Sequence, residues 1–134
     1  MILVDAGPLI ALLDASDAHH ELCTIAIRSI EEPLLTVWPA LTEAMYLLRF
    51  SLEAQEALFG DIERGTLVIA GLDTDDCRRM RHLMRKYRDL PMDLADAALV
   101  AVAERERISR IFTLDRRDFE IYRPAGIRRF EILP

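Results

Sequence analysis

Two aspartates follow directly after short apolar runs and could share one reactive site. Asp5 follows Ile2–Val4, and Asp115 follows Ile111–Leu114; both runs have the β-branched or aromatic character of buried strands. Ligands of parallel sheets bind beyond the carboxyl ends of the strands, so both carboxylates are expected in one crevice. Each aspartate could instead simply cap the helix that follows it, which is a common use of this residue.

Two further acids, Glu43 and Asp96, stand in apolar surroundings. Glu43 lies in a helix that is apolar nearly all round, and the middle of the helix that carries Asp96 contains no other charge. We therefore expect both carboxylates to be at least partly buried, which is costly unless a basic partner, a proton or a metal ion compensates them. A salt bridge to an arginine could explain Glu43, and a capping box with Asp93 as N-cap could explain Asp96.

Together, these four acids predict a divalent metal site. Carboxylate oxygens are the hard ligands that suit Mg²⁺ or Mn²⁺. Such a site can hold an ion, orient a water molecule, lower the pKa of that water and stabilise the charge that develops on phosphate oxygens. The chemistry that this pattern favours is phosphodiester hydrolysis by metal-activated water, without a side-chain nucleophile.

The elements that must position these acids alternate along the chain. Helical spacing and end signals predict helices at Pro8–Asp14, from Asp17 to before Pro33, from Pro39, at Ser51–Gly65, at Thr74–Tyr87 and at Asp93–Arg105. Short apolar runs predict strands at Ile2–Val4, Leu34–Val37, Leu67–Ala70, Ile111–Leu114 and Phe130–Leu133. This alternation predicts an α/β fold, a three-layer α/β/α sandwich around a mainly parallel sheet of four to five strands.

Composition limits the class of protein. The 134 residues, 51% of them hydrophobic, suit one domain over residues 1–134. The longest apolar run, Ala97–Ala103, is too short to span a membrane, and no secretory signal opens the chain, so we expect a cytoplasmic protein. Cys23 and Cys77 form no paired motif. The net charge of -6 argues against a basic nucleic-acid binder, but it permits binding of phosphates through a metal ion.

Four stretches of the sequence together resemble one known family. They are Ile2–Asp5, Leu41–Ala44, Pro91–Val100 and Ile111–Phe119, of which the last two are the more specific. With these stretches the chain resembles the PIN-domain family, and within it the VapC-type toxins of bacterial toxin-antitoxin pairs. The resemblance implies a PIN-like sandwich, Mg²⁺-dependent cleavage of RNA, a homodimer and inhibition by a cognate antitoxin.

The resemblance also implies roles for individual residues. Asp93 matches an accessory acid and Thr113 a hydroxyl that helps to arrange the site, while the catalytic, metal-binding acids are Asp5, Glu43, Asp96 and Asp115. Many relatives carry Ser or Thr after the first aspartate, whereas this chain has Ala6 and Gly7. Backbone amides near Gly7, at a helix start, could replace that hydroxyl.

Other residues allow two interpretations each. Arg78, Arg81 and Arg85 could contact an RNA backbone or simply form the solvated face of an amphipathic helix. Asp118 is expected to stabilise the turn after Asp115, or to reach the metal site through water. Trp38 is expected to be a core or interface side chain rather than a base-stacking platform.

Two rival functions remain at this stage. A phosphoacceptor signalling domain also uses strand-end aspartates and Mg²⁺, but the only lysine, Lys86, lies in the arginine-rich helix rather than after a late strand, and Glu43 would have no role. A catalytically silent PIN fold that serves as an interaction module is the other alternative. Acids at all four positions argue against it.

Overall fold

A five-stranded parallel sheet forms the centre of the computed structural model, which describes residues 1–134. The strand order is β3-β2-β1-β4-β5, and each neighbouring pair is parallel. The strands are β1 (Ile2–Val4), β2 (Leu34–Val37), β3 (Leu67–Ala70), β4 (Arg110–Phe112) and β5 (Glu131–Leu133). The carboxyl ends of all five strands therefore lie along the same edge of the sheet.

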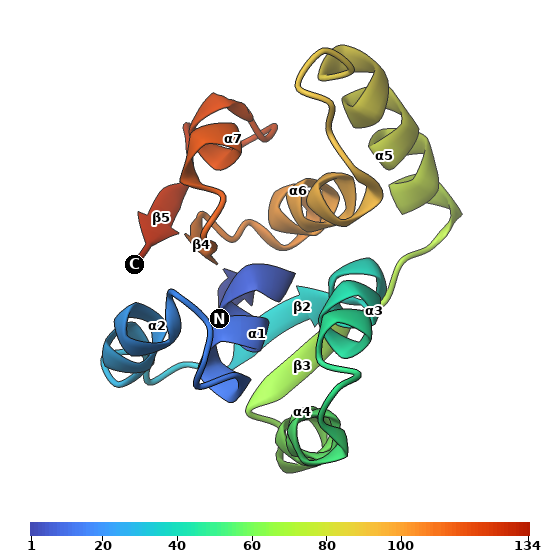
Figure 1. The fold of residues 1–134 in the computed structure, drawn as a ribbon. Helices are drawn as coiled ribbons and strands as arrows, with labels where there is room; N and C mark the ends of the chain where they lie inside the picture. Colours follow the sequence, from blue (N-terminus) through green and yellow to red (C-terminus); the bar gives the residue numbers. More distant parts are fainter.

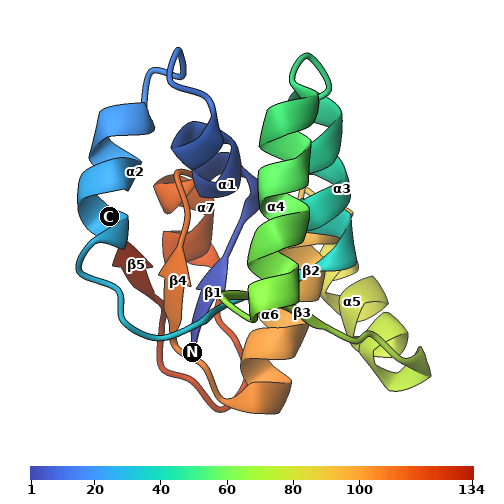
Figure 2. The same cartoon turned by 90° about the horizontal axis from the view of Figure 1, so that it is seen from below.

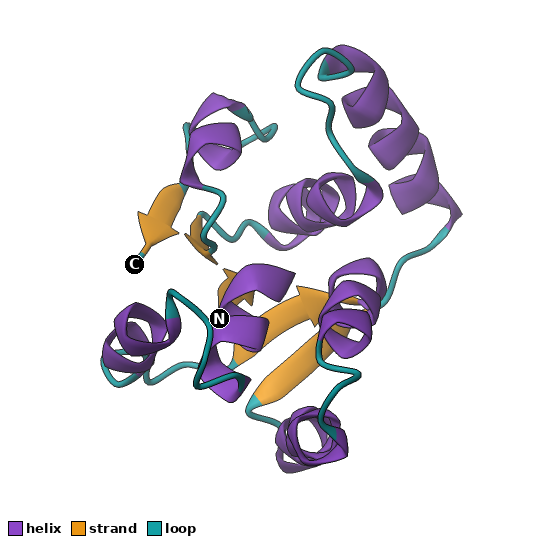
Figure 3. Ribbon diagram, viewed as in Figure 1, coloured by secondary structure: helices purple, strands orange, loops and turns teal.

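Seven helices cover the two faces of this sheet (Figures 1 and 3). They are α1 (Ala6–Leu13), α2 (His20–Ile27), α3 (Trp38–Leu47), α4 (Leu52–Arg64), α5 (Thr74–Lys86), α6 (Leu94–Glu106) and α7 (Arg116–Ile121). Helices α1, α2 and α4 lie in front of the sheet in Figure 2, with α6 and α7 behind it. The predicted three-layer α/β/α sandwich is confirmed. None of the helices has the length and apolar character that crossing a membrane would require.

Two hydrophobic cores, one on each face, hold the layers together. Side chains of a strand alternate between the faces, so Leu3 packs into the core under α5, α6 and α7, while Ile2 and Val4 pack into the core under α1, α2 and α4. Helix α3 joins both, because Ala40 belongs to the first core and Ala44 to the second. The sheet is thus buried on both sides, as its continuous apolar strands indicate.

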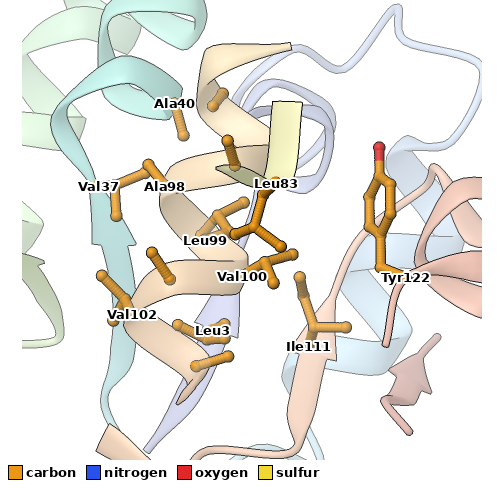
Figure 4. Close-up of a cluster of buried hydrophobic side chains, with 14 of the residues drawn as sticks. Leu3, Val37, Ala40, Leu83, Ala98, Leu99, Val100, Val102, Ile111 and Tyr122 are labelled. Carbon is orange, nitrogen blue, oxygen red and sulfur yellow. The ribbon is translucent and has the colours of Figure 1, made fainter. Parts of the chain in front are cut away.

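Helix α6 is the central element of the first core (Figure 4). Every residue from Ala95 to Ala103 is buried, and its many alanines allow close contact with α3, α5 and the sheet. Because neighbours surround the helix, it needs no polar face. Asp96 is the one charged side chain in this buried stretch, which makes its position informative.

The structure corrects several predicted boundaries. Helix α1 begins at Ala6, two residues before the predicted Pro8, because Asp5 caps it. Helix α2 begins at His20, since the side chain of Asp17 accepts a hydrogen bond from the His19 amide in a turn before the helix. The sequence did not predict α7, whose six residues are too few for a periodic pattern.

Candidate active site

A pocket of about 290 Å³ opens where the carboxyl ends of β1 and β4 meet the starts of α1 and α6. Four residues from the first half of the chain and four from its second half line the pocket. Its lining consists of Asp5, Ala6, Gly7, Glu43, Asp93, Asp96, Leu114 and Asp115. All four acids predicted to be catalytic, together with Asp93, therefore face one pocket, although the sequence separates the first and the last of them by more than a hundred residues.

Asp5 is held by two hydrogen bonds. Its Oδ1 accepts the Ala6 amide at 2.8 Å, and its Oδ2 accepts the Thr113 hydroxyl at 3.3 Å. The same hydroxyl oxygen accepts the Asp115 amide at 3.0 Å, so Thr113 connects the two strand ends. Burial raises the pKa of Asp5 to about 6, and the charges of Glu43 and Asp93 act in the same direction. Asp5 is thus both a helix cap and a destabilised carboxylate in the pocket.

Asp96 is the most strongly perturbed acid of the pocket. Its side chain is buried, and its Oδ2 accepts the hydroxyl of Tyr122 at 2.7 Å. Burial is the main cause that raises its pKa to about 8; the nearby charge of Asp5 adds to this shift, and the Tyr122 hydrogen bond opposes it. At neutral pH this carboxyl group therefore stays largely protonated unless a cation enters the pocket.

A second pair of acids in the chain shows that helix capping does not explain Asp96. In α5, Asp73 and Asp76 form a complete capping box, with both reciprocal hydrogen bonds present at 2.9 and 3.0 Å. In α6, Asp93 accepts the Asp96 amide at 2.8 Å, but the Asp96 carboxylate does not bond back to the Asp93 amide. The side chain of Asp96 is therefore turned to Tyr122 and the pocket.

Asp118 lies close to Asp96 and Asp115. Its predicted role in stabilising a turn does not require this position. Oxygen atoms of Asp96, Asp115 and Asp118 all lie within 4.8 Å of one another. Asp115 is the N-cap of α7 and Asp118 stands three residues further on, so the helical turn brings both to one side. Partial burial and the charge of Asp118 raise the pKa of Asp115.

Glu43 is less buried than its apolar helix predicts. Its side chain as a whole is exposed, because the apolar residues Tyr46 and Leu47 of α3, and Phe50 just beyond it, are exposed at the surface instead of filling a core. Its carboxyl group nevertheless lines the pocket, where partial burial and the charges of Asp93 and Asp115 raise its pKa. The expected partial burial therefore applies to the carboxyl group at the pocket, and the exposed apolar neighbours do not cause it.

No arginine or lysine neutralises the acids of the pocket. The ion pairs of the protein all join other residues, so the salt bridge considered for Glu43 is not formed. The acids gathered here are Asp5, Glu43, Asp93, Asp96, Asp115 and Asp118. Their number equals the formal net charge of -6, so the rest of the molecule is balanced. An oxygen-only donor set without a cationic partner fits a hard divalent cation.

The arginine-rich helix α5 approaches this pocket at one end only. Asp76 in its first turn pairs with Arg105 in the last turn of α6, and Arg79 forms two hydrogen bonds of 2.6 and 2.7 Å with Glu104. The two helices are therefore antiparallel, and the end of α5 lies beside the start of α6. Arg85 belongs to that end, whereas Arg78 lies near the other end and pairs with Asp75.

Tyr122 is the residue of the site that the sequence analysis missed. It follows α7 and carries no charge, so neither the search for acids nor the helical pattern selects it. The one available signal is general: a tyrosine among buried aromatic residues usually needs a hydrogen-bond partner. Trp38 is exposed at the start of α3, so of the two expected positions, core or interface, the core position is wrong.

Known proteins share this arrangement over the whole chain. The family profile described as the PIN domain matches residues 2–124. Ribonuclease VapC26 of Mycobacterium tuberculosis is 30% identical over 135 residues, which cover 99% of this chain and 100% of that protein.

Solved structures agree with the fold. The Mycobacterium tuberculosis protein VapC20, described as a sarcin-ricin loop cleaving toxin, superposes with a TM-score of 0.81 and 22% identity, covering 100% of both chains. A chain of a toxin-antitoxin complex from Klebsiella pneumoniae gives a TM-score of 0.69 with 20% identity, covering 95% of this chain and 92% of that one.

Proposed function

Because this chain belongs to the PIN-domain family, we propose that it is a Mg²⁺-dependent endoribonuclease and the toxin of a toxin-antitoxin pair. The observation that carries the proposal is the pocket that five acids line, with Asp118 close to two of them and no basic partner for any of the six. A relative of nearly the same length carries the name ribonuclease, which supports RNA as the substrate. Family membership leaves no reason to retain the phosphoacceptor alternative.

Asp96, Asp115 and Asp118, whose oxygens lie close together, would hold the proposed cation, with Asp5 and Glu43 at the same pocket. Mn²⁺ suits the same oxygen ligands as Mg²⁺. When bound, such an ion supplies a Lewis acid for phosphate oxygens and lowers the pKa of water. The raised pKa values of Asp5 and Asp96 mean that a cation and protons compete for these carboxylates.

Neighbouring groups of the chain orient the carboxylates of Asp5 and Asp96. Thr113 fixes Asp5 relative to the Asp115 backbone, and the Ala6 amide orients the other oxygen of Asp5. Asp93 uses its carboxylate to cap α6, which holds the first turn that carries Asp96. Gly7 lines the pocket near the start of α1, and its amide is the candidate to replace the missing hydroxyl for a phosphate oxygen.

We propose two protein partners. The structural neighbour from a toxin-antitoxin complex supports a cognate antitoxin that inhibits the nuclease. A second copy of the chain is supported by apolar side chains that α3, α4 and the turn between them expose: Trp38, Tyr46, Leu47, Phe50, Leu52 and Phe59. Large exposed apolar surfaces of this kind mark interaction sites.

Cleavage of defined RNAs tests the proposed function. We expect antitoxin-free protein to cut members of a panel of single-stranded and transfer RNAs with Mg²⁺ and not with EDTA. Asp5→Asn and Asp96→Asn should abolish cleavage and stay folded, because both substitutions keep the shape of the side chain while removing its charge. Asp76→Asn, an acid of the α5 capping box far from the pocket, is the matched control and should still cut RNA.

The outcomes separate the remaining alternatives. Cleavage that persists in EDTA or in Asp96→Asn would contradict the carboxylate metal site. Folded wild-type protein that binds Mn²⁺ but cuts no RNA of the panel would instead favour the catalytically silent interaction module.

A further inference from the structure

We infer that Tyr122 is a positioning residue whose hydroxyl holds the carboxylate of Asp96 so that a single oxygen is presented to a divalent cation. The inference rests on the proposed function, since it concerns the same pocket. It adds a residue that is not an acid and does not itself line the pocket, and whose hydroxyl contacts one lining side chain, that of Asp96.

The two oxygens of Asp96 have different surroundings. Oδ2 accepts the Tyr122 hydroxyl at 2.7 Å, while Oδ1 accepts no hydrogen bond from the protein. Arg110 Nε is the only buried side-chain nitrogen or oxygen without a hydrogen-bond partner, so Oδ1 of Asp96 must reach solvent. The pocket that Asp96 lines is the space in which this oxygen is available. Tyr122 thus occupies one oxygen and leaves the other free for an ion.

The tyrosine ring is itself fixed in place. Tyr122 is fully buried and packs edge to face against Tyr87 and Phe119, at centroid distances of 5.0 and 5.1 Å. Figure 4 shows its hydroxyl at the end of the ring directed away from Ile111. A ring packed in this way holds its hydroxyl in a defined place. Hydrogen bonds to metal-binding carboxylates tune metal affinity.

Helix α7 couples this tyrosine to the other acids of the cluster. Asp115 and Asp118 lie at its start, and the Tyr122 amide donates to the Asp118 carbonyl at 3.0 Å. One short helix therefore delivers two carboxylates and, through Tyr122, orients the third, which α6 contributes. This arrangement is the reason to assign the hydroxyl a role in the site rather than in packing alone.

Tyr87 provides a matched control within the same aromatic cluster. It is also buried, and its hydroxyl accepts a hydrogen bond from the Arg123 amide at 2.9 Å, but it touches none of the acids. Tyr122→Phe and Tyr87→Phe each remove one buried hydroxyl and keep the ring. A difference between the two variants in metal affinity, measured at equal folding, therefore reports on Asp96.

The experiment is calorimetric titration of Mn²⁺ into each purified protein at pH 8, after the thermal unfolding midpoint in EDTA has established that it is folded. For Tyr122→Phe we expect the Kd for Mn²⁺ to rise about tenfold, as is typical for loss of a hydrogen bond to a metal ligand. For Tyr87→Phe we expect an unchanged Kd. Equal Mn²⁺ affinities of the two variants would overturn the inference.

A double substitution separates positioning from a general loss of packing. If Tyr122 acts through the Asp96 carboxylate, adding Tyr122→Phe to Asp96→Asn should change the Kd no further. An additional tenfold loss in that background would show a merely structural effect and overturn the inference. Wild-type protein that binds no Mn²⁺ would overturn the proposed function and this inference together, whereas normal wild-type binding with an unaffected Tyr122→Phe overturns the inference alone.

Discussion

A buried carboxylate without a basic partner destabilises the fold that contains it, and Asp96 is such a residue. Its burial removes water, its only hydrogen-bond donor is neutral Tyr122, and the neighbouring groups are other acids. Asp76, equally buried, is instead compensated by Arg105 and by its capping box. The charge of Asp76 is thus balanced by a basic partner, whereas that of Asp96 is not. Buried acids without such a partner are typical of functional sites.

The uncompensated acids predict how stability changes with pH. The pKa of Asp5 is about 6 and that of Asp96 about 8 in the folded protein, against 3.8 for an unperturbed aspartate. Between pH 5 and pH 8 the folded state therefore binds more protons than the unfolded state, so stability falls as the pH rises. We expect the free energy of unfolding in EDTA, measured with urea, to decrease by a few kcal/mol from pH 5 to pH 8.

Two controls accompany this measurement. Asp96→Asn should flatten the decrease and raise the stability at pH 8, because the charge that burial disfavours is gone. Saturating Mn²⁺ should also remove the decrease by stabilising the ionised carboxylates. Wild-type stability in EDTA that rises from pH 5 to pH 8 would contradict the assigned environment of these acids.

The ends of elements, more than their middles, build the site. Asp5 precedes α1, Asp93 precedes α6 and Asp115 precedes α7, and each occupies an N-cap position. The sequence predicts these acids for two reasons. The ends of apolar strands can be recognised from the sequence, and the resemblance to the PIN-domain family points to the same positions. The sequence could not predict that Asp118 joins them or that Tyr122 contacts Asp96, since both depend on α7, which is too short to leave a pattern.

The direction of α5 predicts which of its arginines contacts RNA. Only the end of α5 that carries Arg85 lies beside the start of α6, while Arg78 is near the other end and paired with Asp75. We expect Arg85→Ala to weaken RNA binding several-fold and to reduce its salt dependence, because a phosphate contact is lost. Arg78→Ala should leave the binding unchanged, as measured by fluorescence anisotropy with Asp96→Asn protein and labelled RNA.

Arg81, midway along the helix, completes this series and is also exposed. A graded effect in the order Arg85, Arg81, Arg78 would support an RNA path that follows α5 from the pocket. Equal binding by all three variants would reject any contact between α5 and RNA and leave these arginines as an ordinary solvated helix face.

For the molecule as a whole, the order β3-β2-β1-β4-β5 explains why the acids converge. Strands β1 and β4 are neighbours in space although far apart in the chain, so Asp5 and Asp115 follow adjacent strand ends. The alternation of strands and helices was sufficient to predict this layered arrangement. It was insufficient for Glu43, because a sequence does not reveal whether an apolar helix face is covered by a core or exposed at a surface.

That exposed face predicts the oligomeric state. Tyr46 and Phe50 are 62% and 67% exposed at the end of α3 and just beyond it, which is unfavourable for an isolated monomer. We expect a homodimer by light scattering after size exclusion, and a shift towards monomer when both residues are changed to serine. A wild type that stays monomeric at high concentration would contradict the proposed interface.

The position of α7 in the chain has a consequence for synthesis. A nascent polypeptide that has emerged only as far as α6 possesses Asp5, Glu43 and Asp96 but lacks β4, Asp115, Asp118 and Tyr122. The set of acids is therefore complete only after β4 and α7 have been synthesised. A chain that cleaves RNA would thus be inactive on the ribosome until this segment has emerged, and products terminated before β4 would be inactive as well.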